Sequence, residues 1–177
     1  VYNFTRANWE KAAPVTAIAA RPGNVPYMDI DSLIADIENS RGQRIDKTTR
    51  LNLRLRNTWP DKILLQVNAN RETNHSGYRF YNIRLSIDNG TGYKLDKAVV
   101  KMVVWKDHKV SAADTVQFEN IPFSGLLNRN LAGEYRGDSI SVSFETITAR
   151  SFNFCYDAGK ENNSGNYNDR WFCRDSN

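Results

Sequence analysis

The stretch at residues 88–105, DNGTGYKLDKAVVKMVVW, decides the fold that we predict. It opens with Asn89-Gly90, a turn signal, because both residue types tolerate positive φ and let the chain reverse. The run from Ala98 to Trp105 is short, rich in β-branched residues and interrupted only by Lys101, which favours a strand over a helix. Apolar side chains fall on both faces of this strand. We therefore predict a central strand, mostly covered on both faces, on which the other strands assemble.

Alternating apolar and polar residues predict further strands on either side of this stretch, at residues 63–68, 81–88, 116–121, 139–145 and 152–155. We expect polar connections at residues 71–77, 106–113 and 123–137, the last with three glycines. Short strands with turn signals and no long helices between them favour a mainly β fold, an antiparallel immunoglobulin-like β-sandwich.

The first 62 residues have a different pattern and form, in our interpretation, a segment of their own. Residues 1–26 are irregular and punctuated by prolines, as in a linker or a peptide laid over another surface. Residues 29–41 predict a short helix with Leu33, Ile34 and Ile37 on one face and Gly42 at its end. Residues 51–56 alternate like a half-buried strand, and residues 59–61 resemble a turn. We expect an N-terminal helix-containing segment at 1–62 and a β-sandwich domain at 63–177.

Composition excludes several classes of protein. The 177 residues are 40% hydrophobic and 25% charged, an ordinary globular balance. The formal net charge of +4 is too diffuse to indicate nucleic acid binding. No apolar run approaches the roughly 18 residues that a membrane span needs. Because the chain begins at Val1 without a signal peptide, we expect a piece of a longer protein whose preceding part holds an export signal or anchor.

Two cysteines, Cys155 and Cys173, flank a polar loop, and each follows a Phe. This pattern favours a disulfide that closes a loop of about 19 residues, for which the chain-entropy model gives roughly 3 kcal/mol. Two reduced cysteines are the alternative. A disulfide implies an oxidising compartment, which is the periplasm, the cell surface or the exterior.

Catalytic and cofactor motifs are missing from the sequence. Both histidines, His75 and His108, fall in expected loops, where a surface position without a role is the simpler interpretation. No nucleophile elbow, zinc-protease motif or phosphate-binding glycine loop occurs. The 157–169 loop offers calcium-type oxygen ligands but without the EF-hand spacing, so we favour a solvated loop. We expect no enzymatic activity, no catalytic residues, no cofactor and no metal.

Two surface features suggest binding. A basic run could meet phosphates or an acidic partner surface, or be a solvated face. Its candidate partner-binding residues are Arg41, Arg44, Arg50, Arg54 and Arg56. Aromatic residues do not interleave with these charges, which argues against single-stranded nucleic acid. A second set of aromatic residues could include a sugar-stacking platform, although core positions are commoner: Tyr78, Phe80, Trp105, Tyr135, Tyr167 and Trp171.

Several short motifs carry a family resemblance. They are Tyr93-x-Leu95-Asp96 before the central strand, the 116–122 segment VQFENIP, and the 152–157 segment FNFCYD with the 171–173 ending WFC. Over residues 63–173 the chain resembles the FxLYD-like β-sandwich domains at the ends of extracytoplasmic proteins of the Bacteroidota. The long 123–137 loop departs from that pattern. The resemblance implies that Asp96 is a turn residue rather than a catalyst, and that no enzymatic activity is present.

These observations together favour a non-catalytic, extracytoplasmic β-sandwich module that contacts a protein or a component of the cell envelope. A carbohydrate-binding module is the alternative, and it would show two or three coplanar exposed aromatic rings on one face. Nucleic acid is not expected as a partner.

Overall fold

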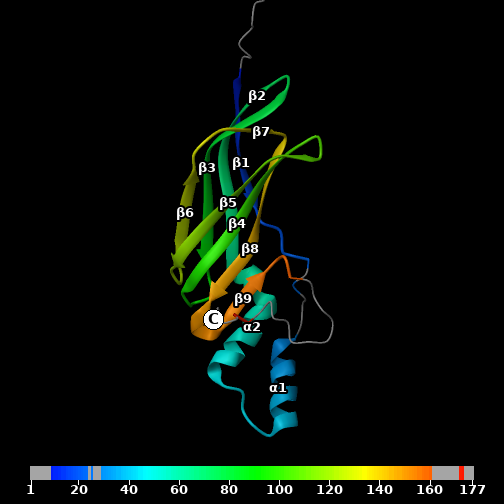
Figure 1. Ribbon diagram of the computed structural model, residues 1–177, viewed down its shortest axis with the longest axis vertical. Coiled ribbons are helices and arrows are strands. Elements are labelled where there is room, and N and C mark those ends of the chain that lie inside the picture. Colours follow the sequence, from blue (N-terminus) through cyan, green and yellow to red (C-terminus); the bar gives the residue numbers. More distant parts are fainter. Residues whose placement is uncertain (1–8, 24, 26–28, 161–171, 174–177) are drawn as a thin grey trace, which may run out of the picture.

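The computed structural model describes residues 9–23, 25, 29–160 and 172–173. Two antiparallel β-sheets face each other along the long axis of the molecule, and two α-helices lie together at one end (Figure 1). The expectation of a mainly β chain with antiparallel sheets is confirmed.

The first sheet holds strands from both halves of the chain. Its strands run in the order β1 (Glu10–Ile18), β2 (Ile63–Asn74), β3 (Gly77–Asn89) and β6 (Leu126–Leu131), while β7 (Tyr135–Gly137) also pairs with β3. Pairing of β1 with β2 joins the first 62 residues to the strands that follow, across the boundary expected from the sequence.

The second sheet is built on the predicted central strand. Its order is β5 (Lys109–Ile121), β4 (Leu95–Lys106), β8 (Ser139–Ala149) and β9 (Phe154–Asp157), so β4 pairs on both edges as predicted. Its two faces differ, however. Val100, Met102 and Val104 are fully buried, whereas Val99 and Val103 on the opposite face are only half-buried. The prediction that both faces are mostly covered was therefore wrong, because no further layer packs on the outer side of the described part of this sheet.

The core lies between the two sheets and is closed at one end by a helix. Alternate residues of β3, β4 and β8 face this core and are all less than 9% exposed: Ile83, Leu85, Val100, Met102, Val104, Val142 and Phe144. Trp59 enters this core from the second helix, with its ring 5.6 Å from Phe144 and 4.6 Å from Tyr156 between centroids. Burial of such a large side chain attaches the helical end to the sandwich.

The predicted helix at residues 29–41 is confirmed as α1 (Ile30–Arg41). Asp29 caps it by accepting a hydrogen bond from the Ser32 backbone N–H, and Gly42 ends it in a left-handed conformation at φ 63°. Ile34 packs with Leu53 of the next helix, so α1 docks on that helix as a short amphipathic helix must dock on something. Neither helix in the described part of the chain has the length and apolarity that crossing a membrane requires.

The prediction of a strand at 51–56 and a turn at 59–61 was wrong, because these residues belong to α2 (Lys47–Lys62). Asp46 caps this helix by accepting from the Thr49 backbone N–H at 2.9 Å. Leu51, Leu55 and Trp59 recur at the four-residue spacing of one helical face and pack on the sandwich. Leucines at every second position therefore resembled a strand although the helical period was also present.

Other irregular regions were also assigned wrongly. Residues 10–18 form the edge strand β1, whose pairing is interrupted around Pro14, where the register shifts. The expected loop at 71–77 contains only a two-residue turn between β2 and β3, and the connection at 106–113 contains a two-residue turn at Asp107 and His108. The expected 123–137 loop contains β6 and β7. Their outward-facing polar side chains hide the strand pattern in the sequence.

Candidate functional site

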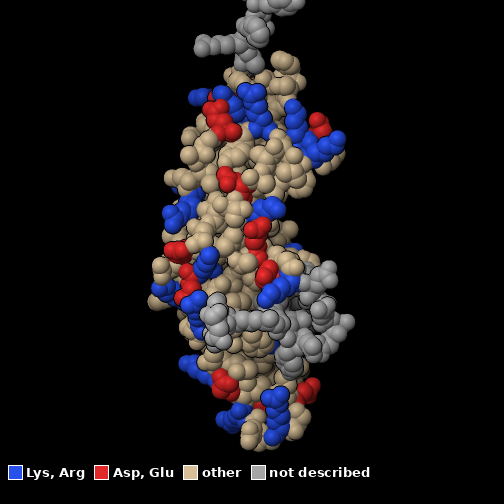
Figure 2. Space-filling model, viewed as in Figure 1, with Lys and Arg blue, Asp and Glu red and all other residues tan. Residues whose placement is uncertain are grey.

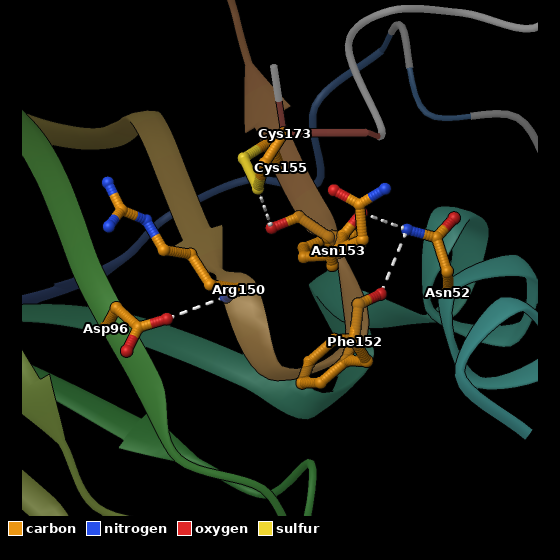
Figure 3. Close-up of a disulfide and its surroundings, with 8 residues drawn as sticks. Asn52, Asp96, Arg150, Phe152, Asn153, Cys155 and Cys173 are labelled. Atoms are coloured by element: carbon orange, nitrogen blue, oxygen red, sulfur yellow. Dashed lines mark hydrogen bonds between the residues drawn. A yellow bond between two sulfur atoms is a disulfide. The ribbon is translucent and has the colours of Figure 1, made fainter. Parts of the chain in front are cut away.

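A disulfide lies where the C-terminal part of the described chain meets the helical end. Cys155 on β9 is bonded to Cys173, with their Cα atoms 5.0 Å apart, which confirms the expected pairing (Figure 3). The bond brings Phe172 to the helices, where the Arg56 guanidinium lies 4.6 Å from the centre of its ring. Residues 161–169 of the expected calcium-type loop lie outside the described residues.

Hydrogen bonds between side chains and the backbone hold this junction in place. Asn52 of α2, fully buried, donates from Nδ2 to the carbonyl oxygen of Asn153 at 2.6 Å (Figure 3). On the other side, Asp96 accepts from the Arg150 backbone N–H at 2.7 Å and fixes the turn that leads into β9. Asp96 itself is the second residue of strand β4, so the expectation that it is a turn residue was wrong.

A pocket of about 250 Å³ opens between the two helices and Phe172. Most of its wall is apolar, and two arginines are among its lining residues. Its lining residues come from three separate parts of the chain: Ile37, Arg41, Ile45, Thr49, Leu53, Arg56 and Phe172. We call it the helical pocket. The arrangement suits a ligand with an apolar group beside a negative charge.

The structure sorts the predicted arginines by their partners. Arg50 pairs with Glu38, and Arg54 pairs with Asp31 at 3.2 Å, so both arginines have partners on α1. Arg41 and Arg56 line the helical pocket. In the part of the chain that the structure describes, neither Arg41 nor Arg44 has an ion-pair partner. On the face shown in Figure 2, Lys and Arg are interspersed with Asp and Glu, so no extended basic surface forms there.

The described aromatic residues of the candidate sugar-stacking set do not form a shared exposed platform. Phe80 is buried, and Tyr78 is half-buried under the guanidinium of Arg71, 4.5 Å from its ring centre. Tyr135 donates its hydroxyl to Asp114 at 2.7 Å, and Trp105 lies on the outer face of β4. Tyr167 and Trp171 lie outside the described residues.

No metal centre is apparent among residues 9–23, 25, 29–160 and 172–173. No group of three or more His, Cys, Asp or Glu side chains there is placed to hold a metal ion. His75 is an exposed residue of the β2–β3 turn and His108 of the β4–β5 turn. Sequence reasoning did not find the helical pocket, because its walls come from α1, α2 and Phe172, which only the fold brings together.

Comparisons of the chain with protein-family models, with curated proteins and with solved structures find no match. The resemblance to FxLYD-like domains therefore stays a prediction from the motifs.

Proposed function

We propose that this chain is a non-catalytic, extracytoplasmic binding module that uses the helical pocket to hold a segment of a partner protein. The single observation that carries the proposal is an apolar pocket with two arginines among its lining residues, at the helical end of the sandwich (Figure 1). The occupant is a large apolar side chain flanked by Asp or Glu.

Size argues for a side chain rather than a cofactor. A volume of about 250 Å³ lies below the roughly 300–1,000 Å³ that is usual for small-molecule sites. It is enough for one anchoring side chain, and such buried anchors contribute much of the affinity in protein interfaces.

Charge argues for acidic neighbours. Arg41 lines the pocket and Arg44 follows α1 closely, and neither has an ion-pair partner among the described residues. Carboxylates on a partner would complement both guanidinium groups and speed association.

The disulfide, the family resemblance and the sheet arrangement also support the proposal. The Cys155–Cys173 disulfide supports an oxidising compartment, that is, the periplasm or cell surface. The motifs that resemble FxLYD-like domains support a place in the cell envelope, and the two antiparallel sheets support an immunoglobulin-like sandwich.

A displayed library of random peptides, selected against the disulfide-bonded protein, tests the function. Enriched peptides should carry a large apolar residue next to Asp or Glu. Ile37→Trp fills the pocket. It should weaken binding of a synthetic copy of an enriched peptide by about tenfold or more, a loss of about 1.4 kcal/mol. Arg41→Glu should weaken it less at high salt than at low salt, because salt screens exposed charges.

The matched control is Leu126→Glu, which changes an exposed apolar residue on the outer face of the first sheet. It should leave peptide binding unchanged. The proposed function would be contradicted if no acidic–apolar peptides are enriched. It would also be contradicted if the enriched peptides bind Ile37→Trp as tightly as the parent protein.

A further inference from the structure

A second cavity lies far from the helical pocket, beside the hairpin that joins β4 to β5. In Figure 1 this hairpin lies toward the opposite end of the long axis from the helices. The cavity has a volume of about 450 Å³ and is lined by Trp105, Asp107, His108, Asp138 and Ser139. We call it the hairpin cleft. Its volume falls within the range of small-ligand sites.

Backbone and side-chain hydrogen bonds fix the walls of the hairpin cleft. Asp138 donates its backbone N–H to the carbonyl oxygen of Trp105 at 2.6 Å, and its Oδ2 accepts from the Asp107 backbone N–H at 2.7 Å. Trp105 donates its indole N–H to the Ser141 hydroxyl at 2.8 Å, which holds the ring. The indole and the Asp138 carboxylate are therefore in place before any ligand arrives, which lowers the entropy lost on binding.

The turn beneath the cleft has a histidine at a position where its conformation favours glycine. Asp107 and His108 occupy the two central positions between the paired residues Lys106 and Lys109, with φ angles of 50° and 60°. Two-residue turns with both φ angles positive prefer Asn-Gly or Asp-Gly, so Asp107 suits its position, whereas His108 stands where glycine is preferred. A histidine kept in place of glycine at the wall of a cavity points to a use for its side chain.

The chemistry of the lining selects the ligand. One aromatic ring provides the apolar surface, and the remaining groups are two carboxylates, an imidazole and a hydroxyl. The C–H face of a sugar ring can pack on an indole, while sugar hydroxyls donate to carboxylates. None of the lining residues is Lys or Arg, and the two carboxylates repel anions, which excludes phosphorylated and acidic sugars.

We propose that the hairpin cleft binds a neutral sugar unit of a glycan, with Trp105 packing on the ring and Asp107 and Asp138 accepting hydrogen bonds from its hydroxyls. This site is independent of the helical pocket. A module that holds a partner protein at one end would thus hold a glycan near the other.

Isothermal titration with soluble neutral oligosaccharides tests the proposal, using oligomers of glucose, xylose, mannose, galactose and N-acetylglucosamine. At least one should bind saturably with a Kd of about 10⁻⁵ to 10⁻³ M. Trp105→Ala should abolish that binding, and Trp105→Phe should retain part of it because the ring remains.

A second variant keeps the test sound if Trp105→Ala fails to fold. Asp107→Asn combined with His108→Gly introduces the sequence that this turn prefers, so the protein should be at least as stable as the parent. It should nevertheless bind the oligosaccharide about tenfold more weakly, because a carboxylate and an imidazole are lost.

The matched control is Ile37→Trp, which fills the helical pocket and should leave sugar binding unchanged. Since this variant weakens only peptide binding, failure of the proposed function and failure of the hairpin cleft are distinguishable. No saturable binding to any neutral oligomer at millimolar concentration would overturn the inference. Unchanged affinity in the turn variant, or binding of sulfated oligomers alone, would also overturn it.

Discussion

The Asn52 side chain ties the second helix to the strand that carries the disulfide, because its Nδ2 donates to the Asn153 carbonyl oxygen at 2.6 Å. The side chain is 0% exposed. Asn52→Ala should destabilise the protein by about 2–4 kcal/mol, since it leaves a buried carbonyl unpaired and creates a cavity. Urea unfolding measures the change. The exposed Arg54→Ala on the same helix is the control and should have little effect. Equal stabilities of Asn52→Ala and the parent would contradict the attachment.

Asn89 holds together the turn that precedes the central strand. Its Nδ2 donates to the carbonyls of Tyr93 and Pro122, at 2.7 and 2.9 Å, and its Oδ1 accepts from the Thr91 N–H and hydroxyl. The residue is fully buried. Asn89→Asp should destabilise strongly at pH 7, by several kcal/mol, because a buried carboxylate would face two carbonyl oxygens.

The Asn89→Asp variant should regain part of its stability at low pH, since a protonated carboxyl can donate again to one carbonyl. Chemical denaturation of the variant and of the parent at pH 4 and pH 7 compares the two states. A difference between variant and parent that does not shrink at the lower pH would contradict this hydrogen-bond network.

The sequence identified the sheets where strands have one clear face. In β3 and β8 apolar residues alternate with polar ones, and in β4 the β-branched run is long enough to exclude a short loop. These patterns reflect burial directly, so the strands and their core residues followed from them.

The prediction was wrong where a local pattern conflicts with tertiary contacts. Leu51, Leu53 and Leu55 satisfy a strand period of two, but the Asp46 cap and the Leu51–Leu55–Trp59 spacing satisfy a helix, and contact with the sandwich favours the helix. Both candidate sites are assembled from distant segments: Phe172 meets α1 and α2, and Asp138 meets the β4–β5 turn. No local window of sequence contains such a pairing.

Tyr135 should titrate at unusually high pH. The hydrogen bond to Asp114, with burial and the carboxylate charge adding to it, raises the pKa of Tyr135 to about 12 from an ordinary value of 10. A raised pKa in the folded state contributes stability that is fully present below pH 10 and is lost as the pH rises through 12. Ultraviolet titration should show one phenol fewer at high pH in Tyr135→Phe. Loss of a phenol that titrates near pH 10 instead would contradict the contact.

Gly137 lies against the backbone of the central strand. A Cβ there would stand 2.5 Å from the Trp105 carbonyl oxygen and 2.6 Å from Val104 Cγ1. Gly137→Ala should cost about 1–3 kcal/mol, because the backbone cannot yield without moving the hairpin. Thermal unfolding measures it.

Gly42→Ala is the comparison for Gly137→Ala, because Gly42 has open space around it but a φ of 63°. It should cost about 1 kcal/mol from conformation alone. In addition, Gly137→Ala should weaken sugar binding at the hairpin cleft, whereas Gly42→Ala should not. Sugar affinities that are equal in the two variants would contradict the link between Gly137 and the cleft.

The disulfide should contribute both stability and one wall of the helical pocket. Cys155 and Cys173 are 18 residues apart in sequence, and closing a loop of that length contributes roughly 3 kcal/mol in the chain-entropy model. Replacing both with Ser should lower the free energy of unfolding by about that amount. Mass measurement with alkylation, before and after reduction, establishes that the bond is present in protein taken from its native compartment.

A double-mutant cycle separates the two contributions of the disulfide. Phe172 reaches the helices through its neighbour Cys173 and lies 4.6 Å from the Arg56 guanidinium. Phe172→Ala should therefore weaken binding of the acidic–apolar peptide when the disulfide is intact, and have a smaller effect when both cysteines are Ser, because the ring is then no longer held at the pocket. If Phe172→Ala weakens peptide binding equally in the two backgrounds, Phe172 is held by other contacts. In the alkylation experiment, two freely alkylated thiols in the native protein would contradict both the bond and the oxidising compartment.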